Sequence, residues 1–225
     1  MNKNLEYLTE NVKILNRQLL EVSWKEVDFD SEKFANGVFS EVLCEEQNEL
    51  ICLITKNIPE WQRLLGCRQH CTHDYCLDIH TLSVLKRVKE FEEFKKLENY
   101  DKLILLYSAL LHDIEKTENQ VDPEHPVKGS KKSSSILFRL GFDEEFINSV
   151  YLLVNYHQVL GLMASDKISF SDEDLVKIFK NPKILELQTM LSIADIKSVK
   201  KNEMFFNGNM DEKIREIISK IRNSF

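Results

Sequence analysis

Apolar residues recur along the chain with the period of α-helices. Between residues 4 and 21 they stand at Leu5, Leu8, Val12, Leu15 and Leu19, close to the i, i+3, i+4, i+7 repeat of an amphipathic helix. The same period predicts helices over residues 76–97, 103–111, 150–157, 183–199 and 211–223, and two more between residues 31 and 56. No run alternates as a strand does, and Asn207-Gly208 lies in a polar connection. The pattern predicts an all-α fold.

Several helix ends carry recognisable signals. Pro126 and Pro182 suit the first turns of two helices, because proline lacks the N–H that a first turn leaves unpaired. Gly141 suits the position just after a helix that ends at residue 140. The stretch Ser171-Asp-Glu-Asp174 resembles a capping box at the start of another helix.

The apolar run 103–111 ends abruptly on His112-Asp113. Unpaired polar side chains are costly in an apolar core, and a divalent metal satisfies imidazole and carboxylate together. For the isolated pair, a His–Asp hydrogen bond at a helix end is the favoured explanation. Further imidazole and carboxylate groups lie on or beside apolar helices, at His80, His125, His157 and Asp195. Each alone fits a paired core or loop residue, but six ligands of one chemical type favour a metal site.

The order His80, His112-Asp113, Asp195 resembles the HD superfamily of metal-dependent phosphohydrolases. The resemblance is closer to the uridylyl-removing HD domain of bifunctional PII uridylyltransferases. Tyr75-Cys-Leu-Asp78-Ile-His80-Thr81 is similar to its Tyr-Thr-Val-Asp-Glu-His-Thr segment, and Ile193-Ala-Asp195-Ile-Lys197 to its Ala-Asp-Ile-Arg. Pro59-Glu60-Trp61 resembles its Pro-Glu-Phe entry. By motif and order the similarity covers about residues 58–205.

This resemblance implies an HD-type helical bundle and assigns roles to the candidate residues. His80, His112, Asp113 and Asp195 would hold a first metal ion, and His125 and His157 a second, with Asp113 bridging the two. Asp113 and Lys116 would be the catalytic residues, Lys116 steadying the phosphoryl charge of the transition state. A solvent-facing lysine after a helix end is the alternative for Lys116.

Two positions depart from the family pattern. Glu115 stands where the family has glycine in His-Asp-Ile-Gly-Lys, and Tyr156-His157 replaces a His-His pair. No nucleotidyltransferase segment precedes the HD-like segment in this sequence, so we expect its activity to be separate from that of a bifunctional enzyme.

A mixed His/Asp site suits one or two ions of Mn, Fe, Co, Ni or Zn better than Ca, which prefers oxygen ligands. Such an ion lowers the pKa of bound water and polarises a phosphoryl oxygen. Lys128, in a small basic cluster with Lys131 and Lys132, is either a solvated helix start or a substrate-binding residue. We also expect His73 near the mouth of the site as a substrate contact.

Composition narrows the class of partner and the compartment. A net charge of −7 with no basic face disfavours duplex nucleic acid and suits a small anionic nucleotide or a nucleotidylated protein. No apolar stretch reaches the length of a membrane span, and no apolar signal core opens the chain, so we expect a cytoplasmic protein with no membrane contact. The five cysteines are then reduced thiols. Cys67, His70, Cys71, His73 and Cys76 are either a zinc site or a loop leading to His80.

The length suits one domain with an extension. We expect an N-terminal helical layer at residues 1–57 and a metal-dependent phosphohydrolase domain at residues 58–225. The layer could be a helical cap, a surface for a partner or the contact of a homodimer. Three functions stay open: hydrolysis of a phosphomonoester or phosphodiester, oxygenation at a di-iron site of HD type, and nucleotide sensing without catalysis.

Overall fold

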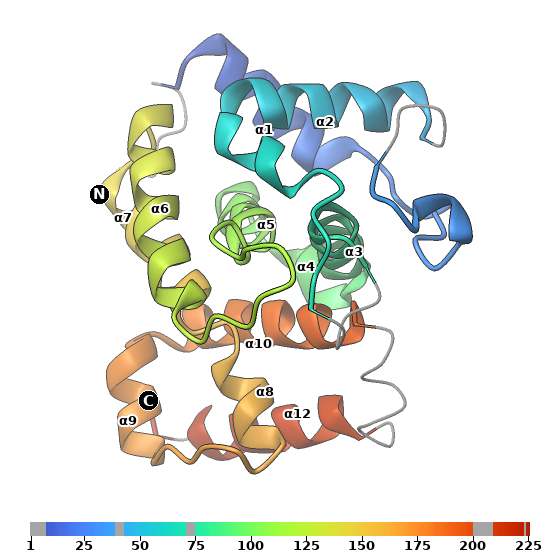
Figure 1. Cartoon of the computed structure of the whole chain (residues 1–225). Coiled ribbons are helices and arrows are strands. Elements are labelled where there is room, and N and C mark those ends of the chain that lie inside the picture. Colours follow the sequence, from blue (N-terminus) through green and yellow to red (C-terminus); the bar gives the residue numbers. More distant parts are fainter. Residues whose placement is uncertain (1–7, 39–42, 71–74, 200–208, 223) are drawn as a thin grey trace.

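The computed structural model describes residues 8–38, 43–70, 75–199, 209–222 and 224–225, and the regular elements in these ranges are all helical. An isolated antiparallel bridge, Arg68 to Cys76, is the β-type pairing that these ranges contain. The expected all-α fold is confirmed (Figure 1). The α-helices are α1 Glu10–Glu21, α2 Glu45–Asn57, α3 Leu77–Glu90, α4 Glu92–Lys96, α5 Asn99–Leu111, α6 His125–Leu140, α7 Glu144–Asn155, α8 Val159–Ala164, α9 Asp172–Phe179, α10 Pro182–Lys197 and α12 Met210–Arg222. Two short 3₁₀ helices, η2 Glu32–Phe34 and η3 Pro59–Leu64, flank α2.

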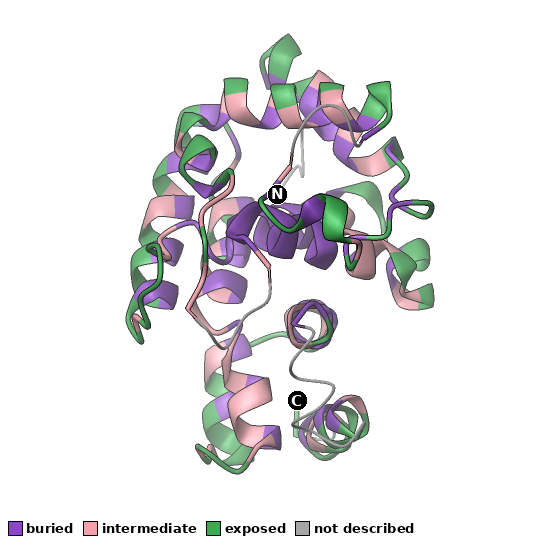
Figure 2. Cartoon of the chain, turned by 45° about the vertical axis from the view of Figure 1, so that its right-hand side comes forward, coloured by how far each residue is buried: buried purple, intermediate pink, exposed green. Residues whose placement is uncertain are grey.

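Helix α5 is the centre of a main tier of helices. It packs against α1, α3, α7 and α10, and α6 covers the outer side of α7 (Figure 1). Every residue from Leu103 to Leu111 is buried, which is why this segment is apolar on all sides rather than along one stripe. Figure 2 shows this enclosed centre, with buried residues concentrated where the helices of the main tier meet.

Helix α10 separates the main tier from a smaller second tier formed with α8, α9 and α12 (Figure 1). Leu187, Leu191 and Ala194 face the main core, while Leu185 and Ile193 belong to the smaller clusters on the other side. A helix covered on two faces needs apolar residues on both, and α10 has them. Asp195 therefore lies on a helix whose surroundings are mostly apolar.

Helices α1 and α2 add an N-terminal layer to the main tier. Val12, Leu15 and Ile54 join the same core cluster as the residues of α5. Side-chain hydrogen bonds reinforce this packing: in the core Tyr107 donates to Asn16 over 2.8 Å, and the partly buried Lys89 donates to the carbonyls of Leu19 and Val22 at the end of α1. The layer therefore shares the core of the rest of the chain, and a domain division at residue 57 stays a prediction.

Local helix signals are confirmed where the structure describes them. Gly141 adopts a left-handed φ of 90° after α6, Ser171 accepts from the backbone of Asp174 at the start of α9, and Pro182 opens α10. The predicted helix from residue 4 begins later, at Glu10, after an extended Thr9, and its first four predicted residues lie outside the described ranges. The last helix runs from Met210 to Arg222; residues 207 and 208, which we expected in a connection, are outside those ranges.

Two segments differ from the prediction because of contacts remote in sequence. Among the described residues between 31 and 56 there is one α-helix, α2, with the short η2 in place of the other, because Gly37 turns with a φ of 101° that no helix accommodates. The single helix predicted for residues 76–97 breaks at Phe91, whose extended backbone separates α3 from α4. Phe91 packs against both the main core and the cluster beneath it, and this burial outweighs the local helix propensity.

Among the described residues, no helix has both the length and the apolar character that crossing a membrane requires.

Candidate metal centre

Six ionisable side chains from five separate segments meet below the middle of the main tier. His80 comes from α3, Asp195 from α10, and His125 is the first residue of α6. His112 and Asp113 follow the end of α5, and His157 lies two residues beyond α7. All are buried apart from Asp195, whose side chain is 18% exposed. These are the six residues that the sequence singled out as metal ligands.

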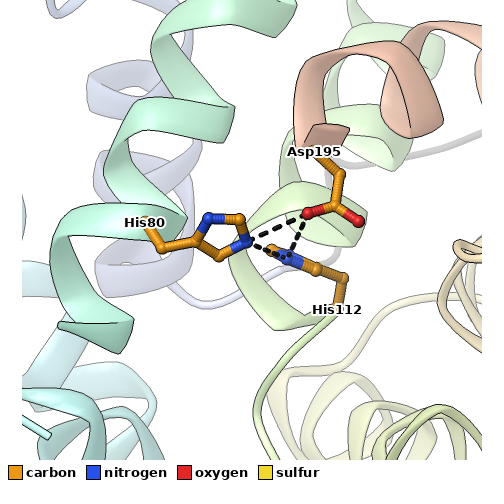
Figure 3. A group of neighbouring side chains, drawn as sticks. All are labelled: His80, His112 and Asp195. Atoms are coloured by element: carbon orange, nitrogen blue, oxygen red, sulfur yellow. Dashed lines mark hydrogen bonds and ion pairs between the residues drawn. The ribbon is translucent and has the colours of Figure 1, made fainter. Parts of the chain in front are cut away.

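The first group is His80, His112 and Asp195 (Figure 3). His80 Nε2 lies 3.0 Å from Asp195 Oδ1 and 3.2 Å from His112 Nε2. His112 Nε2 lies 3.7 Å from the same carboxylate oxygen. Three ligand atoms from three helices or helix ends thus surround one point.

The second group is Asp113, His125 and His157. Asp113 Oδ1 lies 3.3 Å from His125 Nε2 and 3.7 Å from His157 Nε2. The other oxygen of Asp113 turns to the first group, 3.3 Å from His112 Nε2 and 3.5 Å from His80 Nε2. One carboxylate therefore presents one oxygen to each group, which is the geometry of a bridging ligand.

Backbone carbonyls fix the orientation of all four imidazole rings. The Nδ1 atoms of His112, His125 and His157 lie 2.8, 2.6 and 2.7 Å from the carbonyl oxygens three residues before them. His80 Nδ1 lies 3.2 Å from the carbonyl of Ser198, just after α10. Because a carbonyl can only accept, each Nδ1 carries a hydrogen, and in the neutral ring Nε2 keeps its lone pair for the centre of the site. This is how proteins hold metal-binding histidines.

The donor set fits a divalent transition metal. Asp113 Oδ1 and His157 Nε2 are buried atoms to which the described residues supply no hydrogen-bond donor. A buried polar atom without a partner is costly, and a cation placed between the groups would satisfy both. Imidazole nitrogen together with carboxylate oxygen suits Mn, Fe, Co, Ni or Zn.

The site favours positive charge electrostatically. Burial raises the pKa of Asp113, but His112 and Lys116 outweigh it and hold that pKa well below its usual range. Burial lowers the pKa of His112, yet the Asp113 carboxylate prevails and the net pKa is raised. Burial lowers the pKa of His157 to about 4, so this imidazole is neutral at pH 7 and able to bind a metal.

Lys116 lies at the edge of the two groups rather than in solvent. Its Nζ is 2.7 Å from Asp113 Oδ2 and 3.3 Å from Gln69 Oε1, and its side chain is 16% exposed. The solvent-facing alternative for this lysine is therefore wrong. A partly buried ammonium beside the candidate metal ligands is placed to meet an anionic substrate.

Glu115 belongs to neither group of candidate ligands. Its carboxylate is turned to Arg63, with Oε1 3.3 Å from Nη1, and Arg63 also donates to the carbonyl of Lys116 over 3.0 Å. Glu115, which stands where the similar sequence pattern has glycine, thus pairs with an arginine on η3. The other departure, Tyr156, packs against Phe179 in the second tier.

Neither Lys128 nor His73, the other predicted substrate contacts, is placed at the candidate metal centre by the described contacts. Lys128 is about half exposed, and its Nζ lies 2.8 Å from Asp122 and 3.5 Å from Glu124. His73 lies outside the described residues, as does Cys71 of the cysteine-rich stretch. Within the described residues, no cysteine belongs to a group that could hold a metal ion. Lys128 and His73 stay predictions.

Sequence reasoning missed the side chains that support the candidate ligands. Gln188 donates to the carbonyl of Tyr156 over 3.2 Å and Ser192 to that of His157 over 2.9 Å, so α10 holds the turn that carries this histidine. Gln69 contacts Lys116. Their position among the apolar residues of α10 was a weak signal for Gln188 and Ser192, whereas nothing in the local sequence marks Gln69.

Comparison with known proteins points to one kind of enzyme. The chain is 26% identical to the bifunctional uridylyltransferase/uridylyl-removing enzyme of Ruegeria pomeroyi over 76% of its residues, and 27% identical to that of Cereibacter sphaeroides over 78%. It is 30% identical to the enzyme of the same name from Methylococcus capsulatus over 63% of its residues. No protein-family model matches the chain.

These similarities concern one part of larger proteins. The chain covers 21%, 21% and 17% of the three enzymes, so it spans about a fifth of the length of the curated relatives it matches. Most of this chain is thus similar to a limited part of enzymes named for transferring and removing uridylyl groups.

Proposed function

We propose that this protein is a metal-dependent phosphohydrolase of the HD superfamily, acting on a phosphomonoester or phosphodiester of a nucleotide or of a nucleotidylated protein. One observation carries the proposal: four imidazoles, each oriented by a backbone carbonyl, turn their Nε2 atoms to a shared carboxylate, Asp113. In this proposal His80, His112, Asp113 and Asp195 hold one ion, and His125 and His157 hold a second, with Asp113 between them.

Different residues of the chain would have different roles in the hydrolysis. A divalent metal bound there would polarise a phosphoryl oxygen and make water acidic enough to attack near neutral pH. Asp113 would serve as a ligand to both ions, because it presents one carboxylate oxygen to each group of candidate ligands. Lys116 approaches from the edge, and its ammonium would stabilise negative charge that develops on the phosphoryl group. The surrounding apolar helices exclude water and so strengthen these electrostatic contacts.

The relatives support the class of substrate. Their shared name includes the removal of a uridylyl group, which is hydrolysis of a nucleotidyl phosphodiester. The portion that this chain matches is small in each, so we carry over the type of bond and not a particular protein substrate. The chain's acidic balance agrees with a compact anionic substrate rather than duplex nucleic acid.

The bridging position of Asp113 also favours a second candidate, a di-iron oxygenase. Six N/O ligands arranged around one shared carboxylate would hold two irons as well as two hydrolytic metals. Lys116 beside that carboxylate favours hydrolysis, because its charge suits a phosphoryl group. Nucleotide sensing without catalysis is the remaining alternative.

A single set of assays separates these functions. Protein purified without chelator is supplied with Mn²⁺, Fe²⁺, Co²⁺, Ni²⁺ or Zn²⁺ and tested on generic phosphodiesters, nucleotides and uridylylated peptides, with O₂ uptake recorded in parallel. We expect metal-dependent phosphate-ester hydrolysis that Asp113→Asn abolishes and that the exposed control Lys25→Ala leaves unchanged. O₂ consumption with iron and no ester hydrolysis would favour the oxygenase; tight nucleotide binding without turnover would favour the sensor.

A further inference from the structure

Asp78 is a fully buried carboxylate that lies outside both groups of candidate metal ligands. It stands in the first turn of α3, two residues before His80. Its Oδ2 accepts from the backbone N–H of Val38 over 2.8 Å and of Gly66 over 3.1 Å, and its Oδ1 accepts from that of Ile79 over 3.0 Å. One side chain thus ties together three segments: the N-terminal layer, the turn after η3 and the start of α3.

Two glycines make this junction possible. Gly37 has a φ of 101°, and a Cβ built on it would lie 2.7 Å from Gly66 Cα and 2.8 Å from Asp78 Oδ2. Those distances are shorter than real Cβ contacts, so the two backbones can cross here only without a side chain at residue 37. The crossing is what brings the N–H of Val38 onto the buried carboxylate.

Neighbouring contacts also hold residues 35–36 of the N-terminal layer against residues 67–77. Arg68 donates to the side chain of Asn36 over 3.4 Å, and the Cys76 thiol lies 3.8 Å from the carbonyl of Ala35. The N–H of Leu77 donates to the carbonyl of Cys67 over 2.8 Å. The first turn of α3 is therefore held from outside, and His80 follows it directly, with its own N–H bonded to the carbonyl of Cys76.

We propose that Asp78 is a positioning residue that anchors the N-terminal layer to the first turn of α3 and thereby fixes the direction of His80. The N-terminal layer then contributes to the candidate metal centre without supplying a ligand. This inference rests on the proposed function in so far as His80 holds a metal. Groups that orient metal ligands from behind affect metal affinity by about 10- to 100-fold when removed.

The variants are chosen to separate the junction from general loss of stability. Asp78→Ala removes all three hydrogen bonds, while Asp78→Asn keeps an oxygen for Val38 and Gly66 but turns an NH₂ group toward the N–H of Ile79. Gly37→Ala opens the backbone crossing from the opposite side. Gly141→Ala is the matched control: its φ is 90°, but a Cβ there would meet only Leu8 Cδ2, at an ordinary 3.7 Å.

Two readouts are measured on the full chain: the affinity for Mn²⁺ and the hydrogen exchange of residues 77–82 in metal-free protein. We expect Asp78→Ala and Gly37→Ala to bind Mn²⁺ at least tenfold more weakly than wild type and to exchange faster over this segment. Asp78→Asn should recover part of both, and Gly141→Ala should lower the melting temperature without changing either.

Wild-type Mn²⁺ affinity and unchanged exchange in Asp78→Asn and Gly37→Ala would overturn the inference, as would an equal loss in Gly141→Ala. If Asp78→Ala does not fold, the other two variants decide. If the wild-type protein binds no metal, the proposed function fails instead, and exchange over residues 77–82 still decides whether Asp78 anchors α3.

Discussion

His80 and His112 turn their Nε2 atoms toward each other at 3.2 Å, although each has already committed Nδ1 to a backbone carbonyl. Two neutral imidazoles in this state would face each other with lone pairs. A proton or a metal cation between them relieves the repulsion, and Asp195 and Asp113 supply the negative charge that attracts it. The buried interior is thus prepared for a cation before any substrate enters.

Removal of metal should therefore destabilise the protein. A ligand present at 100 times its dissociation constant adds about 2.7 kcal/mol to the free energy of unfolding. For a chain of this size that corresponds to a rise of roughly 5–10 °C in melting temperature. Calorimetry of chelator-treated protein with and without added Mn²⁺ or Zn²⁺ measures the shift, and Asp113→Asn should show none. An identical melting temperature with and without each metal would contradict the account.

Lys116→Ala should separate catalysis from metal binding. The ammonium lies beside Asp113 but is no candidate ligand, so we expect the variant to keep its metal affinity within a few-fold. Turnover of a phosphodiester should fall by about 10²–10³-fold, the usual cost of losing one charge-stabilising donor. Metal content and steady-state kinetics on the same preparation test this. Full activity in Lys116→Ala would remove this lysine from the mechanism.

Glu115→Gly introduces the glycine of the His-Asp-Ile-Gly-Lys pattern that this segment resembles, and it should leave the candidate metal centre intact. The carboxylate pairs with Arg63 instead of entering either group of ligands, so metal affinity should change by less than about twofold. A small loss of stability is expected, on the order of 1 kcal/mol, from the added backbone freedom of glycine and the lost ion pair. Titration of wild type and Glu115→Gly with Mn²⁺ measures the two metal affinities. A tenfold change in affinity would mean that Glu115 contacts the metal.

The ion pair between Glu60 and Arg139 should make the free energy of unfolding depend on pH in the acidic range. Two hydrogen bonds from Arg139, 2.7 and 2.8 Å long, lower the pKa of Glu60 to about 2 from an ordinary value of 4.5. Because the folded-state pKa is the lower one, the pair stabilises the protein above pH 4.5, and this contribution is lost as the pH falls toward 2. Because Arg139 is about half exposed, solvent screens the pair, and its contribution to the free energy of unfolding is on the order of 1 kcal/mol.

Denaturant unfolding of wild type and Glu60→Gln between neutral pH and pH 2 measures the contribution of this ion pair to the free energy of unfolding. The difference between the two proteins should be constant at neutral pH and shrink between pH 4.5 and pH 2. A difference that does not vary with pH would show that Glu60 acts through packing alone.

Local signals in the sequence were sufficient for much of the fold and for the candidate ligands. The apolar run 103–111 predicts a central helix because such a segment has no polar face to expose, and this part of α5 is buried throughout. Histidine and aspartate on or beside apolar helices predict a shared site because each would be costly alone. The structure brings all six of these residues together.

Contacts between residues far apart in the chain could not be predicted in this way. The break at Phe91 depends on two cores that meet at its ring, and the turn at Gly37 depends on Asp78 and Gly66. The pairing of Arg63 with Glu115 joins positions 52 residues apart, and the carbonyl that orients His80 comes from Ser198, 118 residues away. Periodicity carries no information about such pairs.

The most direct test of the metal centre is the number of metal ions bound per chain in wild type and in Asp113→Ala. Asp113 offers one oxygen to each group of ligands, so its loss weakens both ion positions together, while α5 retains the apolar face that stabilises it. Elemental analysis after equilibrium dialysis against Mn²⁺ or Zn²⁺ gives the number of ions per chain in each protein. Circular dichroism verifies that the helices persist. We predict one or two ions per wild-type chain and none in a helical Asp113→Ala variant. Equal metal content in the two proteins, or no metal in the wild type, would contradict the central claim.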